Sequence, residues 1–205
     1  MTSAGKRWGR LSGPLVTLTA LLVVFTGVST ASAATRSADD FEDGDAAGWT
    51  TTGGTWIVTW DGSSHVLRQS TFAENALARK GSPGWRNYTV TAEVKPESFN
   101  GLPGFAGVVV RAQSTTDYYA LVLRPDDTAA LTRTTNGVSQ TLATRRVSVD
   151  EGRWYTLSLG VDGQRLTGSV DGASITATDG FLFGGPAGLI TTWTTASFDD
   201  VVIRY

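Results

Sequence analysis

The sequence has no cysteine, and its 205 residues include one histidine and one methionine. The absence of cysteine excludes a disulfide framework, a thiol nucleophile and a zinc site with cysteine ligands. The single histidine, His65, excludes a metal site built on a histidine pair. No serine lies in the Gly-x-Ser-x-Gly motif of many serine hydrolases. The sequence therefore gives little support for the common kinds of hydrolytic centre.

Acidic residues are missing from the first 33 residues, which contain three basic residues near their start. An apolar run at residues 15–28 follows, and the small residues Ala31 and Ala33 then provide a cleavage site. This order predicts a secretory signal peptide over residues 1–33. The apolar run is shorter than the ~20 residues that cross a bilayer. We therefore expect a secreted, extracellular product with no membrane segment after cleavage.

Residues 34–205 have the length of a single domain, large enough to bury a core without covalent staples. Without the three bases of the leader, 14 Lys and Arg stand against 19 Asp and Glu, a net charge of −5. No cluster of basic residues interrupts this acidity, which argues against a nucleic-acid partner. We expect the domain to be a monomer.

Short β-type runs separated by turn residues fill the rest of the chain. Residues 88–95 alternate strictly between apolar and polar side chains, as a half-buried strand does. Asn136-Gly137 and Asp171-Gly172 are typical of two-residue hairpins. No stretch has helical spacing of apolar residues, so the sequence predicts an all-β, two-sheet antiparallel β-sandwich. The other expected strands are 56–60, 66–69, 105–113, 118–124, 129–134, 138–143, 154–161, 165–170, 187–193 and 197–204.

One expected hairpin joins residues 105–113 to residues 118–124. Direct pairing places Gln113 opposite Tyr118, and an apolar face is expected to form the core. The other face would carry four polar side chains in mid-sheet, Arg111, Gln113, Tyr118 and Arg124. Such a face is either a solvated surface or a platform on which Arg and Gln orient a sugar and an aromatic ring stacks on it. Trp193, at a strand end, is a further candidate for stacking, as is Trp60.

Acidic motifs lie near both ends of the expected domain. Glu42 and Asp43 belong to the first motif, and Asp199 belongs to the second. If the terminal strands pair, these carboxylates approach one another, and such crowding is favourable only with a cation between them. Hard oxygen ligands suit calcium, so the pattern predicts a structural calcium site at Glu42, Asp43 and Asp199. The alternative is a pair of acidic turns with no metal.

Two further possibilities concern catalysis. Glu93 and Glu97 have the spacing of a glycosidase pair on one strand, but Pro96 lies between them and indicates a strand end. A lyase that cleaves uronate polymers by β-elimination needs a base and a cation that neutralises the uronate. Tyr118 with Arg111 or Arg124 supplies these groups, so this alternative stays open.

Several motifs resemble those of concanavalin A-like, laminin-G-like jelly-roll domains found in secreted actinobacterial proteins. The motifs that carry the resemblance are Asp40-Phe41-Glu42-Asp43-Gly44, Trp85-Arg86-Asn87-Tyr88, Gly107-Val108-Val109-Val110-Arg111, Gly152-Arg153-Trp154-Tyr155 and Ser197-Phe198-Asp199-Asp200. Such domains are often appended to pectate lyases and other polysaccharide-degrading enzymes, and are related in fold to levan-binding carbohydrate-binding modules. The resemblance implies that Arg111, Gln113, Tyr118 and Arg124 lie on a concave sheet that holds sugar. The Glu-x-Asp-x-x-Glu strand of laminarinase-type relatives is missing, which counts against a glycosidase.

These observations favour a secreted, non-catalytic module that binds plant or microbial polysaccharide. The expected ligand-binding residues are Arg111, Gln113, Tyr118, Arg124 and Trp193. The uronate lyase is the alternative of a different class, and a protein-binding cell-surface module is a third.

Overall fold

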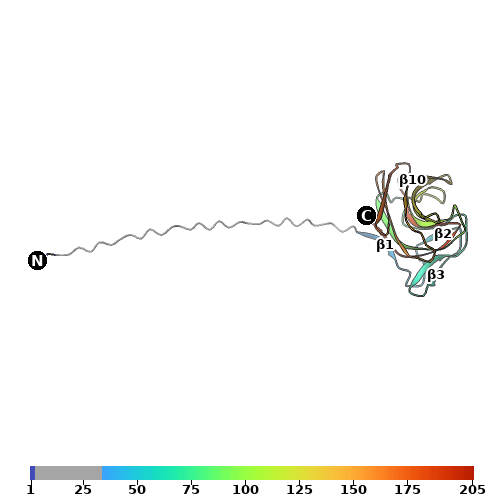
Figure 1. Cartoon of the computed structure of the whole chain (residues 1–205), viewed down its shortest axis with the longest axis horizontal. Helices are drawn as coiled ribbons and strands as arrows, with labels where there is room; N and C mark the ends of the chain where they lie inside the picture. Colours follow the sequence, from blue (N-terminus) through green and yellow to red (C-terminus); the bar gives the residue numbers. More distant parts are fainter. Residues whose placement is uncertain (3–33) are drawn as a thin grey trace. The chain divides into compact units, whose positions relative to one another are not determined.

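The computed structural model describes residues 1–2 and 34–205 (Figure 1). Apart from its first two residues, the predicted signal peptide lies outside the described residues. Fifteen strands and no helix are found in the described part, so no helix there is long and apolar enough to cross a membrane. The strands are β1 (Thr35–Asp39), β2 (Thr50–Thr52), β3 (Trp56–Trp60), β4 (His65–Gln69), β5 (Ala76–Lys80), β6 (Tyr88–Phe99), β7 (Phe105–Val110), β8 (Tyr118–Arg124), β9 (Thr128–Thr135), β10 (Val138–Arg146), β11 (Tyr155–Asp162), β12 (Arg165–Val170), β13 (Ala173–Thr178), β14 (Ala187–Thr192) and β15 (Thr194–Arg204).

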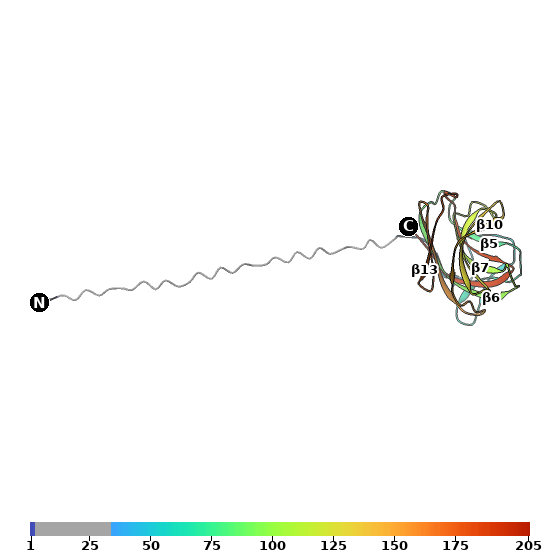
Figure 2. The ribbon, with the colours of Figure 1, turned by 45° about the horizontal axis from the view of Figure 1, so that its top comes forward.

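The strands form two antiparallel sheets that pack face to face. The first sheet has the order β13-β12-β11-β6-β15-β4-β3, with β1 paired to β15, and the second has the order β10-β9-β8-β7-β14-β5-β2. Figure 2 shows β13 in one layer and β5, β7 and β10 in the other. The predicted two-sheet antiparallel β-sandwich is therefore confirmed. The expected pairing of the terminal strands is also found, with Asp39 of β1 opposite Val201 of β15.

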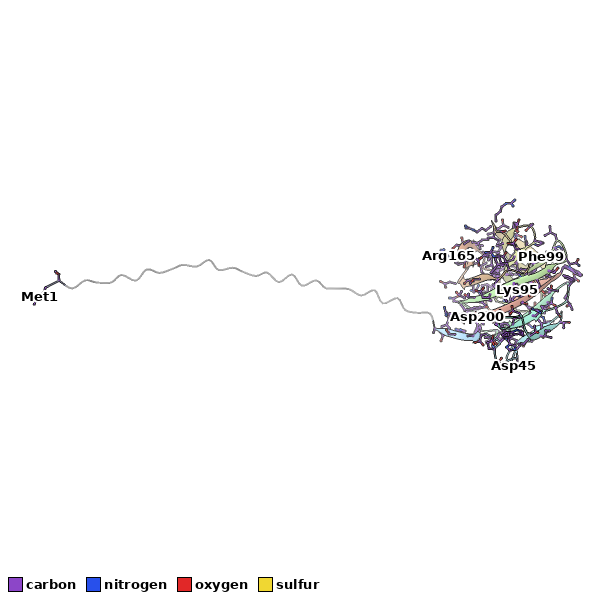
Figure 3. All side chains as sticks on the ribbon, turned by 60° about the horizontal axis from the view of Figure 1, so that its bottom comes forward. Met1, Asp45, Lys95, Phe99, Arg165 and Asp200 are labelled. Atoms are coloured by element: carbon purple, nitrogen blue, oxygen red, sulfur yellow. The ribbon has the colours of Figure 1, made fainter. Side chains whose placement is uncertain are left out.

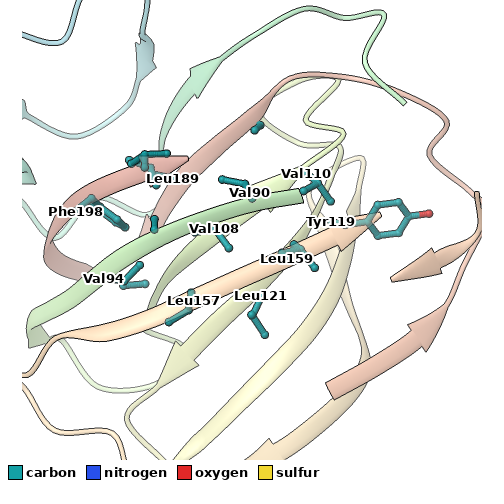
Figure 4. Close-up of a cluster of buried hydrophobic side chains, with 14 of the residues drawn as sticks. Val90, Val94, Val108, Val110, Tyr119, Leu121, Leu157, Leu159, Leu189 and Phe198 are labelled. Carbon is teal, nitrogen blue, oxygen red and sulfur yellow. The ribbon is translucent and has the colours of Figure 1, made fainter. Parts of the chain in front are cut away.

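The main core lies between the sheets and is built from the inward side chains of both (Figure 4). Val90, Val94 and Leu157 enter from the first sheet, and Val108 and Leu121 from the second. All five are fully buried. This core follows directly from the alternation that the sequence shows in residues 88–95 and 118–124.

Turn chemistry explains where several strands end. Asn136 and Gly137 have φ angles of 50° and 76°, and Asp171 and Gly172 have φ angles of 47° and 80°. These left-handed conformations match the two-residue turns that Asn-Gly and Asp-Gly sequences favour. The hairpins β9–β10 and β12–β13 follow from them. Four strands were not among the sequence predictions, namely β1, β2, β5 and β13.

The second sheet is apolar on its outer face as well. A second buried cluster includes Leu77, Val109, Ala120, Val122 and Ile190, all from this sheet. It also includes Ala112, which lies in the loop between β7 and β8. The loop, residues 111–117, crosses the outer face toward β5, where the Asn75 side-chain amide donates to the Thr115 carbonyl (2.8 Å). The loop therefore covers apolar surface that would otherwise face water.

The structure corrects the expected β7–β8 hairpin. β7 ends at Val110, and Val109 lies opposite Ala120, where the sequence predicted Arg111. The shift is two residues, which preserves the side-chain alternation, so the predicted apolar core face is right. Arg111 itself has a φ of 50° and leaves the sheet. It is 3% exposed and does not lie on an open polar face.

Arg111 instead fastens three segments of chain together. Its Nε donates to the Arg86 carbonyl (3.0 Å), and its Nη1 donates to the Leu182 carbonyl (2.7 Å). Its backbone N–H donates to the Tyr88 hydroxyl (2.6 Å), which in turn donates to the Gly185 carbonyl (2.9 Å). Burial lowers the pKa of Arg111, although the side chain keeps its charge. The guanidinium therefore holds the start of the β7–β8 loop against its neighbours.

A second charged interaction with a structural role lies on the first sheet, where Lys95 of β6 forms an ion pair with Asp61 (Lys95 is labelled in Figure 3). The Lys95 ammonium is 3.1 Å from Asp61 and 3.2 Å from Glu97. Burial opposes ionisation of Asp61, but four hydrogen bonds, from Lys95, the Ser63 hydroxyl and the backbone N–H groups of Ser63 and Ser64, outweigh it. The pKa of Asp61 is therefore held well below its ordinary value.

Replacing Arg111 by methionine keeps its apolar stem and removes the guanidinium bonds to Arg86 and Leu182. We expect the free energy of unfolding to fall by about 2–4 kcal/mol, because hydrogen bonds to a buried charged group are lost. The matched control is Arg124→Met, since within residues 34–205 the side chain of Arg124 makes a single long hydrogen bond, from Nη2 to the Thr141 hydroxyl (3.4 Å). The control should change stability by no more than ~0.5 kcal/mol. Urea unfolding measures both, and equal losses would contradict the role assigned to Arg111.

Asp61 should make the domain sensitive to acid. A carboxyl group with a depressed folded-state pKa stabilises the fold above its unfolded pKa, about 3.9, and this contribution is lost as the pH falls below that value. Asp61→Asn should therefore lower the free energy of unfolding at pH 7 by about 1–3 kcal/mol. Between pH 5 and pH 2, the free energy of unfolding of the variant should change less with pH than that of the wild type. Urea unfolding across this range tests it, with the exposed Asp150→Asn as control. A mutant with the wild-type acid dependence would refute the assignment.

Candidate functional site

The β7–β8 loop borders two hollows on the outer side of the second sheet. The larger, which we call the aromatic hollow, has a volume of about 630 Å³. The smaller, which we call the basic hollow, has a volume of about 360 Å³. Thr116 of the loop lines the aromatic hollow, and Ala112 and Gln113 line the basic hollow. The loop that covers the outer apolar cluster thus also shapes both concave sites.

Three aromatic side chains from different parts of the sheet line the aromatic hollow. Phe105 begins β7, Tyr118 begins β8 and Trp193 follows β14. Trp193 has a φ of 45°, and its backbone is held at both ends, by its N–H to the Ala73 carbonyl (2.7 Å) and by the Asn100 N–H to its carbonyl (2.8 Å). These two hydrogen bonds hold Trp193 in a left-handed conformation that a bulky residue rarely adopts. Phe105 and Trp193 are half-buried, so part of each ring stays open to a ligand.

Polar groups lie among these rings. Tyr118, Thr134 and Ser139 stand opposite one another on β8, β9 and β10. Glu74 and Asn75 enter from the segment before β5. Asn75 Oδ1 is buried and has no hydrogen-bond partner among the described residues, which is costly unless a donor arrives. Open aromatic faces beside hydroxyl, carboxylate and unpaired carbonyl groups match the chemistry of a sugar, which has apolar ring faces and a rim of hydroxyl donors.

The structure distributes the five predicted ligand-binding residues over different places. Tyr118 and Trp193 both line the aromatic hollow, but Tyr118 is only 4% exposed, so it forms part of the wall and is not the open platform that the sequence predicted. Gln113 is exposed and lies in the basic hollow. Arg111 is buried beside the basic hollow with its guanidinium occupied by carbonyl groups. Arg124 is half-buried and lines neither hollow.

This placement bears on the lyase alternative. Burial raises the pKa of Tyr118, whereas a phenol that removes a proton at neutral pH needs a lowered pKa. Arg111, one of the two expected neutralising cations, makes its hydrogen bonds to the carbonyls of Arg86 and Leu182. The arrangement of these residues favours binding over proton abstraction.

The three predicted calcium ligands, Glu42, Asp43 and Asp199, make hydrogen bonds within the protein. Glu42 accepts from the His65 N–H (2.9 Å) and lies 3.2 Å from its Nδ1, and these hydrogen bonds lower its pKa. Asp199 accepts from the Ser64 hydroxyl (2.7 Å), and its burial raises its pKa. Asp43 instead accepts from the Asp45 N–H within its own turn (3.2 Å).

These contacts do not fit the predicted calcium ion. No group of three or more acidic or histidine side chains within residues 34–205 is placed to share a metal ion. A cation bound by all three predicted ligands would have to draw Asp43 out of its turn and Glu42 away from His65. Calcium at Glu42, Asp43 and Asp199 therefore stays a prediction.

A third hollow, about 530 Å³, lies on the outer face of the first sheet. Its floor includes Thr89, Thr91, Ser158 and Gly160, with Tyr205 as one of its few aromatic residues. Of its two aromatic residues, Tyr88 is buried and the ring of Tyr205 has the Arg36 guanidinium 4.2 Å from its centroid, so this hollow suits a sugar ring less well than the aromatic hollow does.

Sequence reasoning missed several lining residues. Phe105 was expected at the start of a strand, but nothing in the sequence indicates that it faces Trp193. Asn75 precedes β5, a strand that was not predicted. Arg79 lies on β5 itself, which lacks the alternation of polar and apolar residues that indicates a half-buried strand. Arg86 and Phe183 lie outside strands, where no periodicity places a side chain.

No protein-family model matches the chain. An extracellular exo-alpha-L-arabinofuranosidase of Streptomyces chartreusis is 33% identical over 172 residues, which is 79% of this chain and 20% of that protein. The chain therefore spans about a fifth of the length of this relative.

Solved structures support the fold. The carbohydrate-binding module CBM66 from Bacillus subtilis matches with a TM-score of 0.68 and 22% identity, over 77% of this chain and 96% of the module. Domain 4 of AbnA, an extracellular arabinanase from Geobacillus stearothermophilus solved in complex with arabinotriose, matches with a TM-score of 0.60 and 15% identity, over 84% of this chain and 92% of the domain. A Bacillus subtilis protein of unknown function with a galectin-like fold has a TM-score of 0.61 and 15% identity, covering 83% of this chain and 96% of its own. At these identities, the likeness establishes the β-sandwich that this chain shares with all three.

Proposed function

We propose that this domain is a non-catalytic module that binds polysaccharide in the aromatic hollow. The observation that carries the proposal is the convergence of the half-buried Phe105 and Trp193, beside the buried Tyr118, around Asn75. Within residues 34–205, the side-chain carbonyl of Asn75 is buried and has no hydrogen-bond partner. A sugar ring stacks on the aromatic faces, and a sugar hydroxyl donates to Asn75 Oδ1. Glu74 and the hydroxyl groups of the hollow accept from or donate to the remaining hydroxyls.

The comparisons support this proposal and suggest its first ligands. One structural neighbour is named a carbohydrate-binding module, another was solved with arabinotriose, and the sequence relative is an arabinofuranosidase. Short arabinose oligosaccharides are therefore the first ligands to test. The extracellular relative also supports secretion. Attachment to a polysaccharide-degrading enzyme, which the resemblance to domains of pectate lyases implies, is part of the same proposal.

Removing the Trp193 ring should weaken this binding. We expect Trp193→Ala to reduce the affinity for arabinotriose at least about tenfold, because a stacking surface is lost. Phe105→Ala should have a smaller effect in the same direction. Isothermal titration calorimetry measures both, and circular dichroism checks that the fold is kept.

Trp60→Ala is the matched control. Trp60 is 57% exposed, but it lies at the end of β3, beside His65 and away from the second sheet. Its loss should leave the affinity unchanged. If wild-type protein does not bind arabinose, fructose or xylose oligosaccharides, or if Trp60→Ala weakens binding as much as Trp193→Ala does, the proposed site is wrong.

Thermal unfolding decides the calcium prediction. An ion that binds the folded state alone raises the unfolding temperature in proportion to the logarithm of its concentration. If the prediction holds, calcium at millimolar concentration raises the temperature relative to chelator, and Asp199→Asn removes the rise. If the unfolding temperature is the same in calcium and in chelator, the calcium prediction is wrong.

A further inference from the structure

The basic hollow is a separate concave site beside the second sheet. Its walls come from the end of β5 and the segment that follows it, the segment before β14 and the start of the β7–β8 loop. Arg79, Arg86, Gln113 and Phe183 supply its side chains, and no acidic residue lines it. The remainder of the wall is largely glycine and proline backbone. The predicted function of the domain rests on the aromatic hollow and leaves this site unexplained.

The charge of the basic hollow is positive. Neither Arg79 nor Arg86 forms an ion pair in the described part of the chain. The guanidinium of Arg111 lies behind the wall, bonded to the Arg86 carbonyl, and burial and then the like charge of Arg86 lower its pKa. Asp162 offsets part of this charge from outside the hollow. Two arginines without an ion pair in the described part therefore line a hollow that has no acidic lining residue, in a protein whose net charge is negative.

Two further groups indicate what kind of anion fits. Arg79 Nε is buried and has no hydrogen-bond partner within residues 34–205, so an arriving oxygen would satisfy it. Phe183 is 70% exposed at the rim and presents a flat apolar surface. The planar fork of arginine matches a carboxylate through two parallel hydrogen bonds. The ring of Phe183 suits the apolar face of a sugar, which inorganic anions lack.

We propose that the basic hollow binds the carboxylate of a uronic acid residue, so that the domain recognises acidic polysaccharide. Arg79 and Arg86 hold the carboxylate, the exposed amide of Gln113 bonds to a neighbouring hydroxyl, and Phe183 covers the sugar ring. The inference rests on the proposed polysaccharide binding and adds a class of sugar to it. The β7–β8 loop joins the two hollows, with Gln113 in one and Thr116 in the other.

Titration calorimetry of the whole domain with trigalacturonate, and separately with neutral arabinotriose, tests the proposal. We expect wild-type protein to bind trigalacturonate and the affinity to fall as salt rises. Arg86→Gln should weaken trigalacturonate binding at least about tenfold, because a bidentate charged contact is lost. Arg79→Gln should act in the same direction. Arabinotriose binding should be the same in wild type and both variants.

Arg165→Gln is the matched control, since it removes one charge from β12 of the first sheet (Figure 3). It should leave trigalacturonate binding unchanged, which separates a specific site from general attraction by charge. Arg86 makes no side-chain hydrogen bond in the described part, so Arg86→Gln should fold normally. Circular dichroism and the unfolding temperature check this.

Three results would overturn the proposal: no binding of trigalacturonate, binding that survives both Arg86→Gln and Arg79→Gln, or equal competition by inorganic sulfate. These results are distinct from failure of the aromatic hollow. If arabinotriose does not bind and trigalacturonate binds through Arg86, the function proposed for the aromatic hollow is wrong and this inference stands. If arabinotriose binding requires Trp193 and trigalacturonate does not bind, the function proposed for the aromatic hollow stands and this inference is wrong.

Discussion

The second sheet must bury apolar side chains on both of its faces, and much of the architecture follows from this constraint. Its inner face joins the common core, and its outer face carries Leu77, Val109, Val122 and Ile190, all fully buried. Each such side chain stabilises the fold by about 1.5–3 kcal/mol when it is removed from water. A covering is therefore required, and the β7–β8 loop provides part of it through Ala112.

Covering the outer face also creates the concave sites. A flat sheet of small side chains has no pocket, but a loop laid across it leaves a hollow on either side. Arg111 makes this arrangement rigid, because it ties the loop to the segments at Arg86 and Leu182. Arg111, which the sequence predicted to bind sugar, thus has a structural role and stabilises the walls of the hollows.

The sequence was a good guide to the elements that depend on local pattern. The alternation in β6 and β8 and the Asn136-Gly137 and Asp171-Gly172 turns predicted strands, core face and hairpins, because side-chain period and positive φ are local properties. β5 was missed because Ala76, Leu77 and Ala78 are all buried and do not alternate in polarity. Arg111 was misplaced because a left-handed residue at a strand end breaks the alternation that the prediction assumed.

The site residues were harder to predict for a related reason. Tyr118 and Trp193 line the same hollow, with Tyr118 buried in its wall. Asn75 lies with them in the aromatic hollow, and Arg86 and Phe183 lie in the basic hollow. All three residues lie outside strands, where no local pattern predicts which distant residues they face. The net charge of the sequence likewise did not predict the local charge of the basic hollow. A domain with more acids than bases still presents a basic hollow, because its acidic side chains lie elsewhere.

Nuclear magnetic resonance of the domain titrated with arabinotriose is the most direct test of the central claim, that polysaccharide binds in the aromatic hollow. The claim predicts that the indole N–H of Trp193, the side-chain amide of Asn75 and backbone signals near Phe105 and Thr116 shift together in a saturable manner. Signals of Thr89 and Ser158, in the hollow of the first sheet, should stay in place. Shifts confined to the first sheet, with Trp193 and Asn75 unmoved, would contradict the account.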